Sequence, residues 1–340
     1  MVNCDMVETG TVYEALPGLS VPLGQALEKL SAMWAPVDET GRKSQSEYRA
    51  SRMNLIVHIG AQATVEEAKE LFQTVIGFSH RYPCRMILLC PRFDSGDGEA
   101  RMSCKIFSEC VFGAEYEGTS CCEALILGYT FRDRQFLENQ VSIFVESDLP
   151  TYYWPTRFGS AQLLSDYTYF FKSAERVIFD SACESFLSDQ VDVSHREKLH
   201  DLAFSRLLSI RQSIGQFMSA YSKERIVDGL KEVSLSCNAS FRSEGRALMD
   251  WVASSLTDCY EPLEDASGRL KFEQVEMAGA EAMLRMSFIY ANSSYLTFDI
   301  DLEKGETHVE ADLGNGKQSM TTGVRLLETQ AALAEALFFA

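Results

Sequence analysis

The sequence predicts an α/β N-terminal domain, with a mixed sheet and flanking helices, followed by an α+β C-terminal domain with an antiparallel sheet. The chain has 340 residues, which exceeds one ordinary hydrophobic core. Residues 53–90 have the strand–helix–strand pattern of a parallel βαβ unit. Residues 271–312 carry about four short β-prone segments separated by turns. Strands flanked by helices in this second half are typical of an α+β domain.

The composition is that of a folded protein with an acidic surface. Hydrophobic residues make up 46% of the chain and charged residues 24%. The formal net charge is −18, from 49 acidic and 31 basic residues, so the long-range field repels nucleic-acid phosphates and anionic lipid headgroups. We therefore expect neither nucleic acid nor a membrane as a partner. The N-terminus lacks the basic start and apolar run of a secretion signal, which predicts a cytoplasmic location.

A lead-in segment, residues 1–50, precedes the first domain. It contains an amphipathic helix within residues 20–35, where three leucines and Trp34 recur at spacings of 4, 3 and 4 and so share one helix face. The remainder of the segment before residue 50 is polar. We interpret this segment as an amphipathic opening helix.

The first domain, residues 51–188, begins with the βαβ unit. Residues 53–59, MNLIVHI, are almost entirely apolar, which is typical of an inner strand covered on both faces. Thr64 and Glu67 have the spacing of a capping box and start the intervening helix. The second strand, RMILLC, ends before Pro91.

Five further elements complete the predicted α/β domain. In order, they are an antiparallel hairpin (101–112 and 119–130), a helix (136–145), a strand (151–154), a helix (161–171) and a strand (176–180). The strand at 151–154 lies between Pro150 and Pro155, and proline removes a hydrogen bond from a β-ladder. We therefore expect this strand to be short.

The second domain, residues 189–340, follows a polar, unpatterned stretch. Its predicted elements are a long helix (195–220), a strand (233–237), a helix (243–256), a loop (262–268), about four strands (271–312) and a last helix from about Gly323. The stretch 314–317, GNGK, lacks the spacing of a phosphate-binding loop and is interpreted as a turn.

The sequence contains no recognisable catalytic or cofactor motif. No GxGxxG opens a helix after a predicted strand, and no histidine lies beside a marked nucleophile such as GxSxG. His195 and His200 are five residues apart, whereas paired metal ligands on one helix face are four apart. His58, within a buried strand, is interpreted as a core residue. We therefore predict no catalytic residue, no cofactor and no metal ligand, and a protein that is not an enzyme.

The ten cysteines indicate buried thiols in a reducing compartment, because most lie in apolar strand-like runs and none forms CxxC. The pairs Cys84/Cys90 and Cys104/Cys110 are each six residues apart, about 20 Å along a strand, so neither pair can bridge internally. The neighbours Cys121 and Cys122 could bind a soft metal or oxidise. Opposite orientation in a strand is the favoured interpretation.

Five segments, taken in order, resemble the glucose-6-phosphate dehydrogenase assembly protein family, OpcA. They are Asn54-Leu55-Ile56-Val57, the HRYPCRMILL segment of residues 80–89, the DLPTYYWP segment of residues 148–155, Phe179-Asp180-Ser181, and Asp201-Leu202-Ala203-Phe204-Ser205-Arg206. The resemblance extends from about residue 50 to residue 260. Arg81-Tyr82 departs from the direct His-Pro of many family members, and residues 151–153 depart from a more aliphatic strand with two tryptophans.

The resemblance implies a non-enzymatic partner that binds glucose-6-phosphate dehydrogenase and promotes its assembly or activity. In some members of the family that activity is linked to thioredoxin-type redox control. Trp154 and Arg157 are the predicted partner-surface residues, with burial of Trp154 in the core as the alternative. The competing function is a small-molecule or sugar-phosphate binding protein or enzyme that uses the strand ends near residues 60–64, 91–98 and 155–159.

Overall fold

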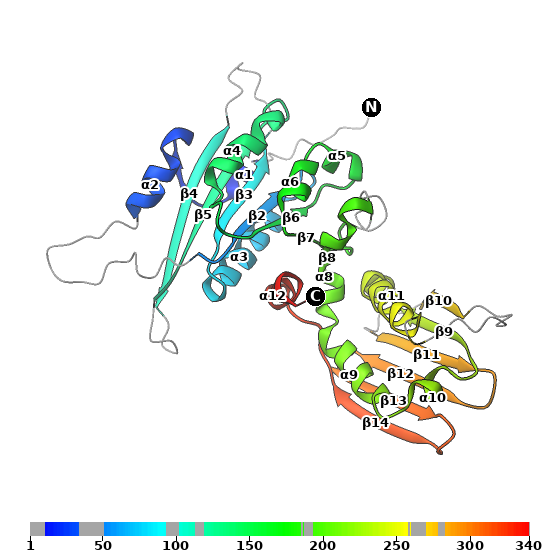
Figure 1. Cartoon of the computed structure of the whole chain (residues 1–340). Helices are drawn as coiled ribbons and strands as arrows, with labels where there is room; N and C mark the ends of the chain where they lie inside the picture. The colour runs from blue at the N-terminus through cyan, green and yellow to red at the C-terminus, as the bar shows by residue number, and fades with distance from the viewer. Residues whose placement is uncertain are drawn as a thin grey trace, which may run out of the picture. The chain divides into compact units, whose positions relative to one another are not determined.

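A computed structural model describes residues 11–33, 51–92, 102–112, 119–184, 186, 193–257, 259, 270–277 and 283–339. The chain divides into two compact units (Figure 1). Unit 1 extends to His200 and also includes the residues from Leu333 onward, and unit 2 is Asp201–Ala332. The division therefore lies later in the chain than the boundary predicted at residue 189.

Unit 1 is built on an eight-stranded mixed sheet with the order β1-β4-β5-β3-β2-β6-β7-β8. The strands are β1 (Leu19–Val21), β2 (Asn54–Ile59), β3 (Arg85–Pro91), β4 (Ser103–Phe112), β5 (Thr119–Tyr129), β6 (Thr151–Thr156), β7 (Arg176–Phe179) and β8 (Leu199–Asp201). The run β5-β3-β2-β6-β7 is parallel, while β4 and β1 are antiparallel additions. The predicted α/β domain with a mixed sheet is confirmed at this level.

Helices cover both faces of the unit 1 sheet (Figure 1). They are α1 (Val12–Ala15), α2 (Ala26–Met33), α3 (Val65–Arg81), α4 (Leu137–Phe144), α5 (Ala161–Ser165) and α6 (Thr168–Ser173), with single 3-10 turns at Leu23–Gln25, Arg134–Phe136 and Val193–Lys198. On one face, α2, α4, α5 and α6 pack on a core cluster that includes Ile56, Ile87 and Tyr153. The opposite face carries α3. Double coverage explains why β2 and most of β3 are apolar without alternation.

Several local predictions for unit 1 are confirmed. The Thr64 side chain accepts from the Glu67 backbone and the Glu67 side chain accepts from the Thr64 backbone, so the predicted capping box starts α3. The strands β2 and β3 are parallel, as the βαβ unit requires. β4 and β5 pair antiparallel as the predicted hairpin, and residues 176–179 form the predicted strand β7.

Other predictions for unit 1 are corrected. β6 continues through Pro155 to Thr156, since the missing N–H of Pro155 does not prevent the Thr156 carbonyl from accepting from Gly60. The helix predicted over 161–171 is two helices, α5 and α6, separated at Asp166 and Tyr167. The helix predicted over 20–35 begins only at Ala26, because residues 19–21 pair with β4 instead.

Unit 2 is a six-stranded sheet with helices on one face and the order β10-β9-β11-β12-β13-β14. Its strands are β9 (Leu230–Cys237), β10 (Lys271–Glu276), β11 (Met283–Tyr290), β12 (Tyr295–Asp301), β13 (Glu306–Asp312) and β14 (Gln318–Gly323). Its helices are α8 (Leu202–Arg206), α9 (Leu208–Met218), α10 (Lys223–Val227), a 3-10 turn (Ala239–Phe241) and α11 (Arg242–Thr257), while α12 (Thr329–Phe338) spans the division between the units. Only the β10–β9 pair is parallel, so the antiparallel-rich α+β prediction is confirmed at this level.

Three predictions for this part of the chain are corrected. The long helix expected over 195–220 is interrupted, because residues 199–201 are extended and Asp201 caps α8 by accepting from the Ala203 backbone N–H at 2.9 Å. The chain adds β14, a polar edge strand, before its last helix. That helix therefore starts at Thr329 rather than near Gly323. The loop predicted at 262–268 lies outside the described residues.

Asn54, the first residue of β2, connects this strand to the turn that precedes β6. Its side chain is fully buried. Its Nδ2 atom donates to the carbonyl oxygens of Glu146 at 2.9 Å and Leu149 at 3.2 Å and contacts the Thr151 hydroxyl at 3.2 Å. Its Oδ1 atom accepts from the Glu146 N–H at 2.9 Å. One side chain thus satisfies the backbone of a turn far away in the sequence.

We expect Asn54→Ala to destabilise unit 1 by about 2–3 kcal/mol, because the buried Glu146 N–H and the Glu146 and Leu149 carbonyls would lose their partner. Urea denaturation measures the change. Asn139→Ala is the matched control, since Asn139 is exposed on α4 and the substitution should leave the free energy of unfolding within about 0.5 kcal/mol. Equal effects of the two substitutions would contradict the role assigned to Asn54.

Candidate functional site

The parallel strands of unit 1 indicate where a ligand would bind. In open α/β sheets, ligands lie outside the carboxyl ends of the strands, where neighbouring strands connect in opposite directions. Here that switch point lies between β2 and β6. The chain passes from β2 to β3 on one side of this position and from β6 to β7 on the other. The loop of residues 60–64 follows β2, and residues 157–159 follow β6.

The chain itself fills the switch point. A Cβ atom placed on Gly60 would lie 2.2 Å from the backbone oxygen of Arg157. A Cβ atom on Gly159, whose φ is +76°, would lie 2.1 Å from the Gln62 side chain. The two loops therefore contact each other, Gly60 through the backbone of Arg157 and Gly159 through the side chain of Gln62. The absence of a side chain on each glycine permits these contacts.

Glu184 uses the hydrogen-bond donors of the loop that follows β6. Its side chain is 1% exposed. It accepts from the Phe158 N–H at 2.8 Å and from the Gly159 N–H at 3.3 Å. Burial raises the pKa of its carboxyl group, while these hydrogen bonds oppose that increase. Backbone donors that could bind an anion at this position are already paired with a carboxylate of the same chain.

The two residues predicted for a partner surface lie in different environments. Trp154 is 3% exposed, and its indole Nε1 is buried without a hydrogen-bond partner. The structure thus corrects the prediction that this ring shapes a contact surface and agrees with the alternative that it fills the core. Arg157 has a 36% exposed side chain, and its Nη2 lies 3.0 Å from Glu67 Oε1. It is at the surface, and its role there stays a prediction.

His58 is a satisfied core residue, as predicted. It is fully buried, with Nδ1 2.9 Å from the Tyr153 hydroxyl and Nε2 2.7 Å from the Tyr129 hydroxyl. Tyr129 in turn donates to the Tyr167 hydroxyl at 3.0 Å. Burial lowers the pKa of His58 to about 3, so its ring stays neutral at physiological pH. The cluster joins strands β2, β5 and β6 beneath α6.

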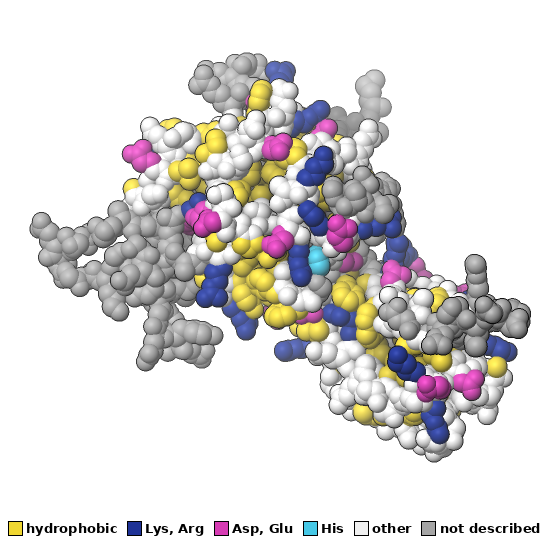
Figure 2. Space-filling model, viewed as in Figure 1, with side chains coloured by type: hydrophobic (Ala, Val, Ile, Leu, Met, Phe, Trp, Pro, Cys, Tyr) yellow, Lys and Arg dark blue, Asp and Glu magenta, His cyan; other side chains and the backbone are white. Residues whose placement is uncertain are grey.

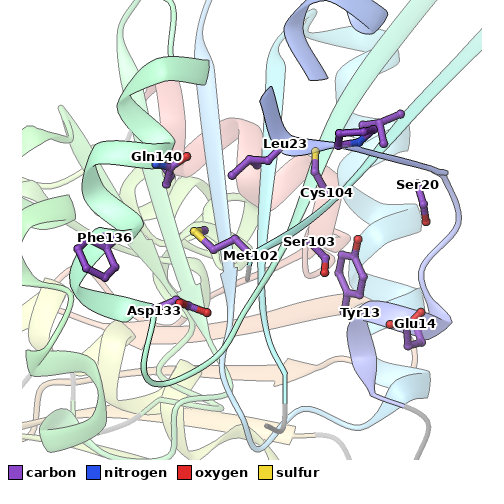
Figure 3. Close-up of a pocket in the computed structure, with 12 residues that line it drawn as sticks. Tyr13, Glu14, Ser20, Leu23, Met102, Ser103, Cys104, Asp133, Phe136 and Gln140 are labelled. Atoms are coloured by element: carbon purple, nitrogen blue, oxygen red, sulfur yellow. The ribbon is translucent and has the colours of Figure 1, made fainter. Parts of the chain in front are cut away.

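An open groove of about 810 Å³ lies at the sheet edge where β5 ends and β4 begins. We call it the edge groove. Figure 3 shows Asp133, Phe136 and Gln140 on one side, Tyr13, Glu14 and Ser20 on the other, and Met102, Ser103 and Cys104 between them. Val21, Pro22 and Leu23 complete the lining. The groove therefore combines an apolar base with polar groups at its margins.

Two cations hold the Tyr13 wall of the edge groove in place. The Lys105 Nζ donates to the carbonyl oxygens of Tyr13 at 2.8 Å and Leu16 at 2.9 Å, and it lies 4.7 Å from the centre of the Tyr13 ring. Arg92 lies 5.2 Å from the same ring. Gly128 is required beside them, because a Cβ there would lie 2.6 Å from the Arg92 side chain. The α1 segment is thereby fastened to the sheet.

The lining of the edge groove favours uncharged or cationic groups over phosphates. Its twelve lining residues include the carboxylates Glu14 and Asp133 but no Lys or Arg. Asp133 is buried and accepts from the Thr130 hydroxyl at 2.8 Å. Sequence reasoning missed this site. The one local signal was the pair Phe131 and Phe136 around a polar stretch, both of which are exposed in the structure.

The cysteines agree in part with the prediction of buried thiols. Those with free thiols and buried side chains are Cys84, Cys90, Cys104, Cys122 and Cys237, while Cys183 is exposed and Cys259 is half-buried. Burial raises the pKa of Cys90 and Cys104 to about 12, so these thiols are protonated at neutral pH. Cys110 is disulfide-bonded, which corrects the prediction for this residue. The side chain of Cys121 lies outside the described part of the chain.

Comparisons with known proteins do not show a family. No protein-family model matches the chain, and no curated protein matches its sequence. One similar solved structure is KijD10, a 3-ketoreductase from Actinomadura kijaniata in complex with TDP-benzene and NADP, with 8% identity, a TM-score of 0.36, and coverage of 84% of this chain and 89% of that chain.

A second similar structure is the aldose-aldose oxidoreductase from Caulobacter crescentus, complexed with glycerol. It has 9% identity and a TM-score of 0.34, and the match covers 83% of this chain and 87% of that chain. We take no function from either likeness. In the described part of the chain, every helix is too short or too polar to cross a bilayer.

We expect His58 to make unit 1 sensitive to acid. The unfolded chain takes up a proton on this histidine near pH 6.5, whereas the folded protein does so only near pH 3. The free energy of unfolding should therefore fall as the pH decreases below about 6.5, with His58 contributing up to about 1.4 kcal/mol per pH unit. Urea denaturation of the parent and of His58→Gln between pH 4.5 and 6.5 measures this contribution.

His58→Gln should show a smaller slope of stability against pH than the parent. Tyr169→Phe is the matched control, because it removes a buried hydroxyl that has no partner from the same face and leaves both contacts of His58 intact. It should keep the parent slope. Identical slopes of unfolding free energy against pH for the parent and His58→Gln would contradict a buried histidine that stays neutral in the folded protein.

Proposed function

We propose that this chain is a non-enzymatic partner of glucose-6-phosphate dehydrogenase that promotes the assembly or activity of that enzyme. The observation that carries the proposal is the ordered set of five segments that resemble the OpcA family. Single short segments match by chance, whereas a fixed order over some 200 residues is a stronger signal. The proposal places the protein in carbohydrate metabolism, at the oxidative pentose phosphate pathway.

The positions of the five segments support a common scaffold. Four of them form or adjoin β2, β3, β6 and β7, which are consecutive in the sheet. Asn54 of the first segment holds the turn that contains the start of the third. In the fifth segment, Asp201 caps α8, and Arg206 donates through Nη2 to Glu244 at 2.7 Å. The first and fifth segments thus have structural tasks that explain their polar residues.

The surface of unit 1 around α4 best fits a protein partner. Phe131, Phe136 and Ile143 lie on or next to α4 and are 43%, 52% and 56% exposed. Figure 2 shows hydrophobic side chains at the surface over this part of unit 1. Aromatic and arginine side chains are frequent anchors of interfaces, and the partly exposed Arg157 follows the carboxyl end of β6. We propose these four side chains as contacts of the dehydrogenase.

One observation favours a second function, the binding of a small molecule in the edge groove. Its volume of about 810 Å³ lies within the range of ligand pockets. The carboxylates in its lining favour a ligand without phosphate, so the sugar-phosphate version of this function has less support. Thioredoxin-type redox control stays a prediction. The exposed thiol of Cys183 and the disulfide of Cys110 are the groups that such control would address.

Co-purification tests the proposed partner. We expect the chain to co-elute with the glucose-6-phosphate dehydrogenase of the same organism and to change its oligomeric state or rate. Phe136→Glu should weaken the complex at least about 10-fold, because a charge would replace an exposed apolar anchor. Ile289→Glu is the control, since Ile289 is 45% exposed on β11 of unit 2.

The outcomes of this test separate the function from the surface. Absence of a complex and of any change in dehydrogenase rate would contradict the proposed function. A complex that Phe136→Glu and Ile289→Glu weaken equally would contradict the proposed surface and leave the function standing. Arg157→Ala against Arg285→Ala, an exposed arginine of unit 2, tests the arginine contact in the same way.

A further inference from the structure

Three side chains with metal-binding atoms meet at the end of the sheet opposite to the edge groove. His80 lies in the last turn of α3, Glu109 in β4 and Cys122 in β5. One ligand atom from each lies within 4.8 Å of the other two. The edge groove contacts β4 at Ser103 and Cys104, so this group is separated from it by several residues along the strand.

The fold brings these residues together from three elements. Glu109 and Cys122 are direct partners in the antiparallel β4–β5 register. Direct partners in a strand pair point to the same face of the sheet. Phe107, two residues before Glu109, contacts Phe72 of α3, so Glu109 and Cys122 point to the face that carries α3. The buried Ser79, one residue before His80, interacts with the Cys122 thiol, so this thiol lies against the end of α3. The arrangement therefore follows from packing of α3 on the hairpin.

The distances fit a tetrahedral ion. His80 Nε2 and Glu109 Oε2 are 3.4 Å apart. Two ligands at about 2.0–2.1 Å from a tetrahedral zinc ion are roughly 3.4 Å apart, so this pair already has the spacing of one edge. The Cys122 sulfur lies within 4.8 Å of both atoms, so it has to approach by at most about 1 Å for a Zn–S bond of about 2.3 Å. Rotation of the Glu109 and His80 side chains, which are 49% and 20% exposed, can supply this movement.

We propose that His80, Glu109 and Cys122 bind one Zn²⁺ ion. A thiolate, an imidazole and a carboxylate are the ligand types that select zinc over the oxygen-preferring Mg²⁺ and Ca²⁺. Three protein ligands leave the fourth position to water. Cys122 is buried and Glu109 is exposed, so the ion enters from the side of Glu109.

Binding involves one proton and no electrons. The free Cys122 carries an S–H group, because burial raises the pKa of its thiol above the usual value. Zn²⁺ forms a bond to Sγ as the S–H bond breaks, and the proton passes to solvent. A bound ion would also tie the end of α3 to the β4–β5 hairpin and stabilise unit 1.

Cobalt titration of the full chain tests the site. The protein is prepared without a histidine tag and with Cys183→Ala, which removes the most exposed thiol among the cysteines that the structure describes. We expect one Co²⁺ per chain with a thiolate-to-cobalt charge-transfer absorption, and displacement of Co²⁺ by Zn²⁺. Cys122→Ala should abolish this absorption. Glu109→Gln and His80→Gln should weaken zinc binding at least about 10-fold.

Cys90→Ala is the matched control, because Cys90 is a fully buried thiol of β3 that lies outside the group of three. It should keep the cobalt spectrum and the zinc affinity. Glu109 is exposed, so Glu109→Gln decides the test even if Cys122→Ala fails to fold. Failure to bind zinc at micromolar concentration, unchanged affinity in Glu109→Gln and His80→Gln, or a thiolate absorption that persists in Cys122→Ala would overturn the proposal.

Discussion

The backbone contact between the loops after β2 and β6 constrains what unit 1 can do. Gly60 and Arg157 approach so closely that even a methyl group on Gly60 would clash. Glu184 pairs with the N–H groups of the second loop from within the protein. Beneath them, His58 and three tyrosines fill the space between the strands. The part of an open α/β sheet that normally receives a ligand is packed with the protein's own groups.

The candidate binding sites of unit 1 lie instead at the margins of the sheet. At one margin, the edge groove and the exposed apolar residues of α4 form a surface with apolar anchors and carboxylates. At the opposite end of the strands, α3 and the β4–β5 hairpin bring together a histidine, a glutamate and a cysteine. Both places depend on helices packed against a sheet that is covered on both faces.

Much of the fold could be predicted from local patterns. The βαβ unit was predicted from the apolar runs at 53–59 and 85–90 and from the Thr64 capping box. Burial on both faces of a strand and helix capping each leave a signal in the local sequence. The helix break at Asp201 and the additional strand β14 could not be predicted. An aspartate that caps one helix interrupts an otherwise helical periodicity, and the polar β14 is a strand only because β13 offers it an edge. The edge groove draws on segments far apart in the sequence, so no single pattern indicated it.

Hydrogen–deuterium exchange with and without NADPH, a dinucleotide of the kind that open α/β sheets bind, tests whether the switch point between β2 and β6 is closed. We expect slow exchange of the Phe158 and Gly159 amides in the free protein, because both donate to buried Glu184, and no change when NADPH is added. Saturable NADPH binding that protects residues 60–64 and 157–159 would contradict a closed switch point.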